Sequence, residues 1–464
     1  MFSIDPEVRR TQRAVLLMVS ATAFANALML SSANVALPDI AGDLAIDAVL
    51  LNWIPLAFLT AAAMLVLTFG RLADMYGRKR VMLGGTVAVI ITSVLAASAT
   101  DATWLIVFRL LQGASAATSL VTVISVVSSA MPAESRGRAF GLVASTVYFG
   151  LSVGPVVAGI VIDLAGWRWA FLIHLPFAVI ALYVGVAVVK IDWQAERRGR
   201  FDLAGAIIYA SAIVALACGI AMLPSVKATL LLLTALAGFV LFVRVEVRTS
   251  DPLFNVRLFQ SHPLFTLSCA AAFLMYAATF SMLALVSLYF QYVKSLSAQA
   301  TGLVMMAQPV TVALFAQQAG RLADRMEPRI LASLGIAATG CGLVMLTALD
   351  STTSIAYIVA SLVISGYGFC LFAPVNAHAV MSSVEPIHFG TASGGHASFK
   401  VIGQMMGMAV VTLVFSATMG RVKISPENYA ALENSISISF GFASALCIPA
   451  FVISALRGNI HAAR

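Results

Sequence analysis

Few side chains in this chain can hold a charge or a proton, and several of them stand where charge is costly. Arg109, His174 and Lys400 lie inside long apolar runs, where a charged group must be paired or face a wet cavity. Asp39 and Asp163 stand near the ends of such runs, and no Asp or Glu lies deep inside one. A histidine can bind a proton at physiological pH, and a lysine that faces a cavity favours neutral or anionic molecules. These residue types therefore allow proton binding and charge selection inside a membrane.

Each of these side chains also has a purely structural interpretation. A lone histidine such as His174 is more often a hydrogen-bonded packing residue, and Arg109 or Lys400 could extend its head group to the membrane surface. No cluster of His, Asp and Glu gathers at one membrane depth, which argues against an enzyme. The five cysteines all fall inside apolar runs at spacings that match no metal site. We therefore expect buried free thiols, no metal and no cofactor.

The elements that must position these residues are membrane-spanning helices. Of the 464 residues, 61% are hydrophobic and only 10% are charged, which is far too little charge for a soluble protein. Runs of about 20 apolar residues recur, and each is long enough to cross the roughly 30 Å of hydrocarbon in a bilayer. The expected spans lie near residues 14–36, 50–70, 82–99, 103–129, 139–162, 169–189, 203–223, 228–247, 263–291, 301–320, 331–349, 354–379, 391–418 and 437–457.

The basic residues predict how the chain is oriented. If the N-terminus is cytoplasmic, most Lys and Arg residues fall on the cytoplasmic side, as the positive-inside rule requires. The even number of spans then places both termini in the cytoplasm. These loops explain the net charge of +8, so nucleic acid is not an expected partner. The chain has no Asn-x-Ser/Thr sequon and its loops are short, which favours a bacterial inner membrane.

A repeated pentapeptide indicates an internal duplication. Gly70–Asp74 and Gly320–Asp324 are identical, and each joins the second and third spans of a six-span half. The separation between the copies leaves room for two further spans. We therefore expect a six-span N-terminal bundle over 1–200, two inserted spans over 201–250 and a six-span C-terminal bundle over 251–464. Such repeats are typical of secondary transporters.

The first copy belongs to a longer motif that resembles a known family. Gly70-x-Leu72-Ala73-Asp74-x-x-Gly77-Arg78-Lys79 is similar to the signature loop of the major facilitator superfamily. The whole chain most resembles the fourteen-span drug/proton antiporters of that superfamily. A carboxylate near a helix N-terminus is stabilised by the helix dipole, and arginine can pair with it. The resemblance implies that this loop latches the two halves in the outward-facing state, whereas a generic basic loop is the alternative. Glu327 and Pro328 replace the second glycine and its arginine in the second copy, so we expect that copy to matter less.

The fourth span carries a second motif of this family. Arg109, Gln112 and Gly113 match its Arg-x-x-Gln-Gly pattern, and by resemblance the arginine tunes the protonation of a nearby acid. The family usually has an aspartate in the first span, but Met29 occupies that position here. Any proton must therefore be carried elsewhere. The candidate coupling residues are Arg109, Gln112, His174, Asp39 and Asp163.

The fifth span contains Gly150-x-x-x-Gly154-Pro155-x-x-Ala158-Gly159, which resembles the family's antiporter motif. Small residues at these spacings line one helix face and let another helix pack closely, and Pro155 kinks the helix. In the family this seam is associated with exporters rather than importers. Ordinary helix packing is the alternative interpretation.

Three further residues are candidates for the substrate cavity. Asn34 ends the first span in a pattern that matches the fourteen-span family, and Trp53 fits its second-span pattern. Lys400 stands in the thirteenth span, where the family often has a basic residue.

These features predict an all-α membrane protein of the major facilitator fold, with two six-helix bundles and two extra helices between them. We expect it to export small amphipathic compounds, drugs or toxic metabolites, by proton antiport and alternating access. A facilitator or importer of a small metabolite on the same fold is the alternative. The expected partners are an amphipathic substrate, protons and the lipid bilayer, and the expected oligomeric state is a monomer.

Overall fold

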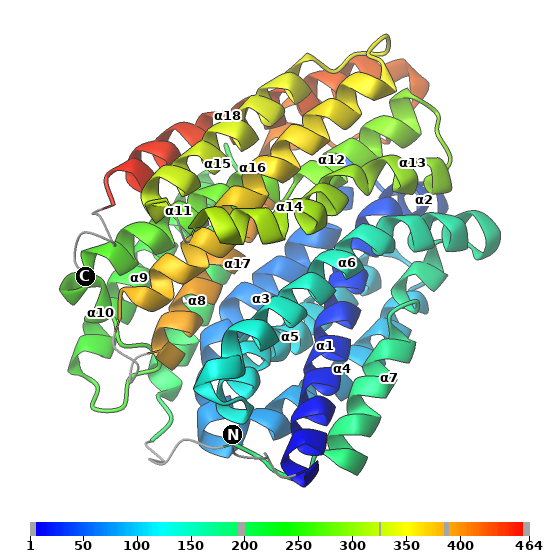
Figure 1. The fold of residues 1–464 in the computed structure, drawn as a ribbon. Coiled ribbons are helices and arrows are strands. Elements are labelled where there is room, and N and C mark those ends of the chain that lie inside the picture. Colours follow the sequence, from blue (N-terminus) through cyan, green and yellow to red (C-terminus); the bar gives the residue numbers. More distant parts are fainter. Residues whose placement is uncertain (1–5, 194–199, 324–325, 385–388, 458–464) are drawn as a thin grey trace.

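The computed structural model describes residues 6–193, 200–323, 326–384 and 389–457, and every regular element over these residues is a helix (Figure 1). The N-terminal elements are α1 (Pro6–Val35), α2 (Leu37–Asp43), α3 (Ala48–Tyr76), α4 (Arg78–Ala97), α5 (Ala102–Ala130), α6 (Ala133–Ala165), a 3-10 helix (Trp167–Phe171), α7 (Leu175–Tyr183) and a π-helix (Val184–Val188). The middle elements are α8 (Leu203–Ala221), α9 (Val226–Arg248) and α10 (Leu258–Ser261). The C-terminal elements are α11 (Pro263–Thr279), α12 (Met282–Leu288), a π-helix (Tyr289–Val293), α13 (Ala298–Met305), α14 (Ala307–Ala323), α15 (Pro328–Met345), α16 (Ile355–Ser382), α17 (Phe389–Thr418) and α18 (Tyr429–Ala455), with 3-10 turns at Leu346–Ala348 and Pro426–Asn428.

Fourteen helical segments of the described chain are long and apolar enough to cross a membrane, which confirms the predicted number of spans. Several of these segments consist of consecutive pieces. The sixth runs through the 3-10 helix, α7 and the first π-helix, the ninth runs through α11, α12 and the second π-helix, and the tenth runs through α13 and α14. The eleventh and fourteenth each include a 3-10 turn at one end. Breaks of this kind occur inside membrane proteins where backbone groups are buried in protein or line a cavity. His174 lies at such a break, directly before α7.

The helices form two groups, which are coloured blue to cyan and green to red in Figure 1. In the N-terminal group α1 packs on α6, and α3 and α4 both pack on α5. In the C-terminal group α11 packs on α17, and α15 packs on α16 and α18. The groups meet where α3 packs on α17 and where α6 packs on α13 and α14. The hairpin of α8 and α9 is placed against both groups, because α8 packs on α3 and on α17.

The signature motif is mostly helical, although the expected spans 50–70 and 82–99 leave it between them. Residues 70–76 continue α3, and α4 begins at Arg78, so the connection is the single residue Gly77. The backbone of Gly77 has φ of +111°, which glycine adopts at little cost. Arg, Leu, Ala and Met are good helix formers, so the polar motif extends the helix although it interrupts the apolar run.

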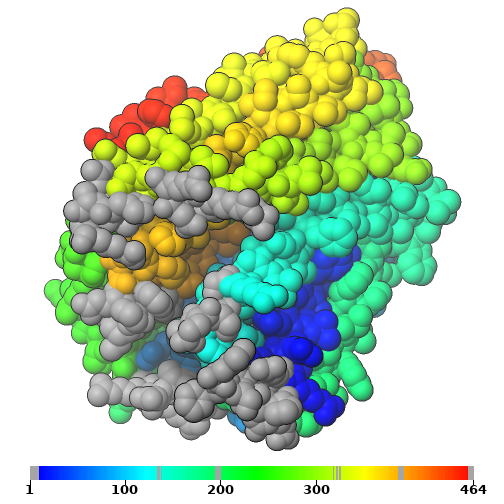
Figure 2. Space-filling model, viewed as in Figure 1, coloured from blue at the N-terminus to red at the C-terminus, as the bar shows by residue number. Residues whose placement is uncertain are grey.

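The two groups are joined at one end of the molecule. We call the end with Gly77 the latch face, and the end with α2 the opposite face. At the opposite face, Gln291 Nε2 donates to Val35 O at 2.9 Å, and Ala48 N donates to Val422 O at 2.9 Å. At the latch face, Figure 2 shows the surface hollowed between α17 (orange) and α6 (cyan). The structure is therefore closed at the opposite face.

Candidate transport and coupling sites

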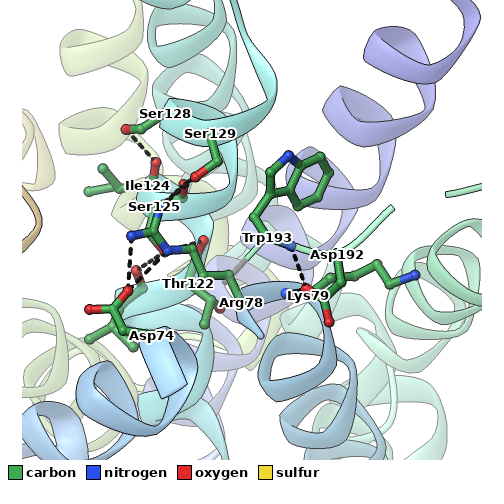
Figure 3. Close-up of polar contacts among 11 residues, drawn as sticks. Asp74, Arg78, Lys79, Thr122, Ile124, Ser125, Ser128, Ser129, Asp192 and Trp193 are labelled. Atoms are coloured by element: carbon green, nitrogen blue, oxygen red, sulfur yellow. Dashed lines mark hydrogen bonds and ion pairs between the residues drawn. The ribbon is translucent and has the colours of Figure 1, made fainter. Parts of the chain in front are cut away.

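Asp74 and Arg78 form the centre of the latch site (Figure 3). Arg78 Nε and Nη2 donate to Asp74 Oδ1 at 3.1 and 2.9 Å. Arg78 Nη1 donates to Ser125 O at 3.3 Å and to the hydroxyl of Ser129. These bonds tie the α3–α4 turn to α5 of the same group. Since both charged side chains are partly exposed, the pair contributes only about 0–1 kcal/mol and serves mainly to orient the turn.

The carboxylate at the N-terminus of α4 is Asp192, which the sequence analysis missed. Asp192 Oδ1 accepts a hydrogen bond from Lys79 N at 2.9 Å, and Asp192 Oδ2 lies 3.4 Å from Arg80 Nε. A Cβ on Gly77 would lie 2.3 Å from Asp192 Oδ2, so this approach requires glycine. The prediction that Asp74 takes the favourable dipole position is wrong, because Asp74 lies in the last turn of α3. In the sequence, Asp192 could have been noticed as an acidic residue among the basic ones that follow the sixth span.

The remaining glycine of the first motif copy is less constrained. A Cβ on Gly70 would find its nearest neighbour, Val121 Cγ1, at 3.9 Å, which is ordinary contact. Asp324 of the second copy lies outside the described residues.

Arg109 is buried, with 1% of its surface exposed, and does not extend to the membrane surface. Its Nη1 donates to Gln112 Oε1 at 2.5 Å and its Nε donates to Ile54 O at 3.3 Å. Its guanidinium lies 4.5 Å from the centre of the Phe58 ring and 5.8 Å from that of Phe171. Cation–π contacts with desolvated rings are worth about 2 kcal/mol or more. No Asp or Glu of the described chain lies within ion-pair distance of Arg109.

A hydrogen-bonded chain leads from Arg109 to His174. Gln112 Nε2 donates to Ser93 Oγ at 2.7 Å, and Ser93 Oγ lies 3.0 Å from His174 Nε2. The Ser93 hydroxyl also donates to Val89 O at 2.6 Å, which assigns the Nε2 proton to His174. His174 Nδ1 then carries a lone pair that is buried without a partner. The chain links α5, α4 and the start of α7, and all its side chains are buried.

Asp39 and Asp163 lie together at the opposite face, and no hydrogen bond or ion pair described in the structure joins them to the Arg109 chain. Partial burial of its carboxyl group, and secondly the nearby charge of Asp163, raises the pKa of Asp39 above its usual value, although the residue as a whole is exposed. Asp163 Oδ2 accepts a hydrogen bond from Gln299 N at 3.1 Å, so it connects α6 to the start of α13. The five predicted coupling residues thus form two separate clusters.

The antiporter motif of α6 packs against two helices. A Cβ on Gly150 would lie 2.9 Å from Ala27 Cβ, and one on Gly154 would lie 1.9 Å from Ser31 Oγ, both on α1. Further along, a Cβ on Gly159 would lie 2.4 Å from Ala298 O. In return, a Cβ on Gly302 of α13 would lie 2.1 Å from Pro155 O. Glycines therefore let α6 and α13, one helix from each group, meet backbone to backbone.

The three cavity candidates occupy different environments. Asn34 is buried in α1 and Trp53 is half-buried in α3. Lys400 of α17 is half-buried, and its Nζ lies 5.0 Å from the centre of the Tyr276 ring. Phe369 packs edge-on against Tyr276 with ring centres 5.5 Å apart. Lys400 and these two rings form a cationic, aromatic surface within the C-terminal group.

The fold and these interfaces define a multi-pass membrane protein with two packed groups of helices, and its family makes it a transporter and not an enzyme. The chain belongs to the Major Facilitator Superfamily, whose model matches residues 19–408 and again residues 267–459. It is 30% identical to the multidrug resistance protein Stp of Mycobacterium tuberculosis over 416 residues, which cover 88% of this chain and 77% of Stp. It is 25% identical to the riboflavin transporter RibZ of Clostridioides difficile, with 95% of this chain and 96% of RibZ covered. A crystal structure of the peptide transporter POT with sulfate shares the fold, with a TM-score of 0.70, 15% identity and coverage of 97% and 95% of the two chains.

Proposed function

We propose that this protein exports small amphipathic compounds by proton antiport through alternating access. The observation that carries the proposal is the glycine seam of α6, where Gly159 and Gly302 bring two helices of different groups into backbone contact. Such a contact can close one face tightly and can separate without breaking many polar bonds. The hollow at the latch face would admit a substrate from that side. The similarity to Stp, a multidrug resistance protein, supports export.

The proposal includes an orientation and a coupling site. The latch face and both termini would be cytoplasmic, in a bacterial inner membrane, as the basic residues predict. The buried chain from Arg109 to His174 would couple proton and substrate movement, together with Asp39 and Asp163. One transported proton supplies about 2.3 kcal/mol per 100 mV of membrane potential, which is sufficient to drive useful accumulation.

The substrate is expected to be neutral or anionic and aromatic. Lys400 presents a positive charge beside Tyr276, and no hydrogen bond or ion pair of Lys400 is described. A cation would be repelled there, whereas a planar aromatic molecule could stack on the ring. The similarity to RibZ favours the second candidate function, a facilitator or importer of a metabolite such as riboflavin.

Transport into inverted membrane vesicles tests the proposal. Riboflavin serves as a neutral aromatic probe, fluorescein as an anionic one and ethidium as a cationic one. We expect uptake of riboflavin or fluorescein that depends on an acidic vesicle interior and collapses with a protonophore. Uptake that ignores the pH gradient would replace the antiporter by a facilitator, and preferential uptake of ethidium would contradict the proposed role of Lys400.

A further inference from the structure

The helix hairpin α8–α9 contains a pair of carboxyl groups that no motif of the chain points to. Glu246, in the last turn of α9, is only 3% exposed and is the one buried Asp or Glu among the described residues. Asp202 precedes α8 as its N-terminal cap. A Cβ on Gly205 would lie 2.5 Å from Asp202 Oδ2 and 2.6 Å from Glu246 Oε1. The two oxygens are therefore close neighbours, and only glycine at position 205 leaves room for both.

Each carboxyl group uses one oxygen for the backbone and turns the other toward its neighbour. Asp202 Oδ1 accepts a hydrogen bond from Gly205 N at 2.8 Å, and Glu246 Oε2 accepts one from Phe254 N at 2.9 Å. The remaining oxygens, Asp202 Oδ2 and Glu246 Oε1, are buried and receive no hydrogen bond from a donor. Both oxygens point to the same place beside Gly205, within 2.5 and 2.6 Å of where a Cβ would stand. Because an ionised carboxylate cannot donate, the two groups can hydrogen-bond to each other only when one of them holds a proton.

Two arginines of the neighbouring segments are engaged with other groups. Arg71 of α3 lies 3.7 Å from Asp251, and Arg257 donates to Val247 O at 3.0 Å. No Lys, Arg or His of the described residues forms an ion pair with Asp202 or Glu246. On α17, which packs against α8, the titratable groups are His396 and Lys400. Two adjacent carboxylates without a cation repel each other strongly when both are charged, whereas one shared proton removes the repulsion.

The position of the pair connects it to the movement of the two helix groups. Asp202 begins α8, which packs on α3 of one group and on α17 of the other. Glu246 ends α9, whose outer surface is largely exposed and suited to contact lipid. Tyr209 of α8 and Phe242 of α9 pack with ring centres 5.2 Å apart, so the two helices of the hairpin are in direct contact. Repulsion between the two charged groups would loosen the start of α8 at the latch face.

We propose that Asp202 and Glu246 form a proton-binding site in which the two carboxyl groups share one proton, and that loss of this proton weakens the hold of α8 on α3 and α17. This inference rests on the proposed proton antiport. It supplies a carboxyl site for the proton, because Met29 replaces the aspartate that the family usually has in the first span. The ligand is a single proton, which leaves as hydronium when the site opens to water. No covalent bond changes.

Infrared spectroscopy of the purified protein in lipid tests proton binding without any substrate. We expect the wild type to show the carbonyl stretch of a protonated carboxylic acid at neutral pH, and to lose it as the pH rises. Glu246→Gln should lack this band, and Asp251→Asn, which removes a neighbouring acid outside the pair, should retain it. A band that is unchanged in Glu246→Gln would overturn the site.

Transport assays distinguish a coupling role of the Asp202–Glu246 pair from a purely structural one. Glu246→Gln and Asp202→Asn can each donate an amide N–H to the remaining carboxylate, so the fold should be kept while the proton is lost. A gradient of one pH unit coupled to one proton supports at most about tenfold accumulation, and we expect both variants to lose it while exchange of riboflavin across the membrane continues. Full pH-driven accumulation in both variants would show that the shared proton is structural. If the wild type itself ignores the gradient, the antiport proposal and this coupling role fail together, while the infrared titration still decides whether the pair binds a proton.

Discussion

At the scale of single residues, the sequence could show which groups are unusual but not what they contact. Arg109 and Gln112 are three positions apart, so their contact on one helix face follows from the helical repeat. Ser93 and His174 come from other helices, and no local pattern joins them to Arg109. Glu246 was passed over because it stands at the end of an apolar run, where a carboxyl group normally reaches water. Its burial arises from the segment that follows α9 and from Asp202, which are tertiary contacts.

The hydrogen bonds that lead from Arg109 to His174 predict how strongly each substitution along them should affect proton coupling. Arg109→Ala should uncouple transport from the pH gradient, and Ser93→Ala should reduce coupling less severely because it breaks only the link to His174. Ser145→Ala is the matched control, since Ser145 is exposed and bonds only within its own helix. The measurement is riboflavin accumulation in vesicles with and without a pH gradient. Equal coupling in Ser93→Ala and wild type would show that the chain is a packing feature.

The opposite face provides a pair of aspartates with opposite expected effects on stability. The pKa of Asp39 is raised above 3.8, so its ionisation costs folding free energy as the pH rises above that value. The Trp167 and Arg168 side chains hydrogen-bond to Asp43 and lower its pKa below 3.8, so its contribution is present above that pH and is lost in acid. At pH 7, Asp39→Asn should raise the melting temperature of the purified protein and Asp43→Asn should lower it. At a pH well below 3.8 both differences should shrink, and shifts of the same sign at pH 7 would contradict the assignment.

At the scale of helices, hydropathy predicted where the chain crosses the membrane but not where each helix ends. A polar motif such as Gly70–Lys79 leaves the apolar run, yet helix formation depends on backbone propensity and caps, so α3 continues to Tyr76. The glycine spacing of the fifth span correctly indicated a face for close packing. It could not tell that this face serves two partners, α1 and α13, because partners depend on the arrangement of the whole bundle.

The packing of the glycine seam of α6 predicts which of its glycine substitutions harm export most. A side chain at Gly159 would meet the backbone of Ala298, which cannot rotate away, whereas one at Gly154 would meet the Ser31 hydroxyl, which can. We expect Gly159→Leu to abolish export with the protein still inserted, and Gly154→Leu to reduce it less. Gly141→Leu is the control on the same helix, because a Cβ there has nothing within 4 Å. Comparable export in Gly159→Leu and Gly141→Leu would show that the motif contributes only ordinary helix packing.

At the scale of the whole molecule, the sequence repeat predicted a duplication, and the second match of the family model begins within the C-terminal half, at residue 267. Hydropathy placed the hairpin α8–α9 between the halves along the chain, but it carries no information about neighbours. In the structure α8 touches both groups, so the hairpin is positioned to respond to their relative movement. In the proposed alternating-access cycle, a structure that is closed at the opposite face and hollowed at the latch face is one of the two states.

Alternating access requires the opposite face to open, and a covalent link between the groups tests this requirement. Ala48 of α3 and Val422, which follows α17, are joined by a backbone hydrogen bond of 2.9 Å. In a background with Cys341→Ser, which removes the exposed native thiol, the pair Ala48→Cys and Val422→Cys should form a disulfide under mild oxidation. We expect transport to stop when the link forms and to return after reduction, because a linked face cannot separate. Each single variant, treated with the same oxidant, should transport normally. Continued transport by the fully linked protein would mean that substrate crosses without separation of the two groups at this face.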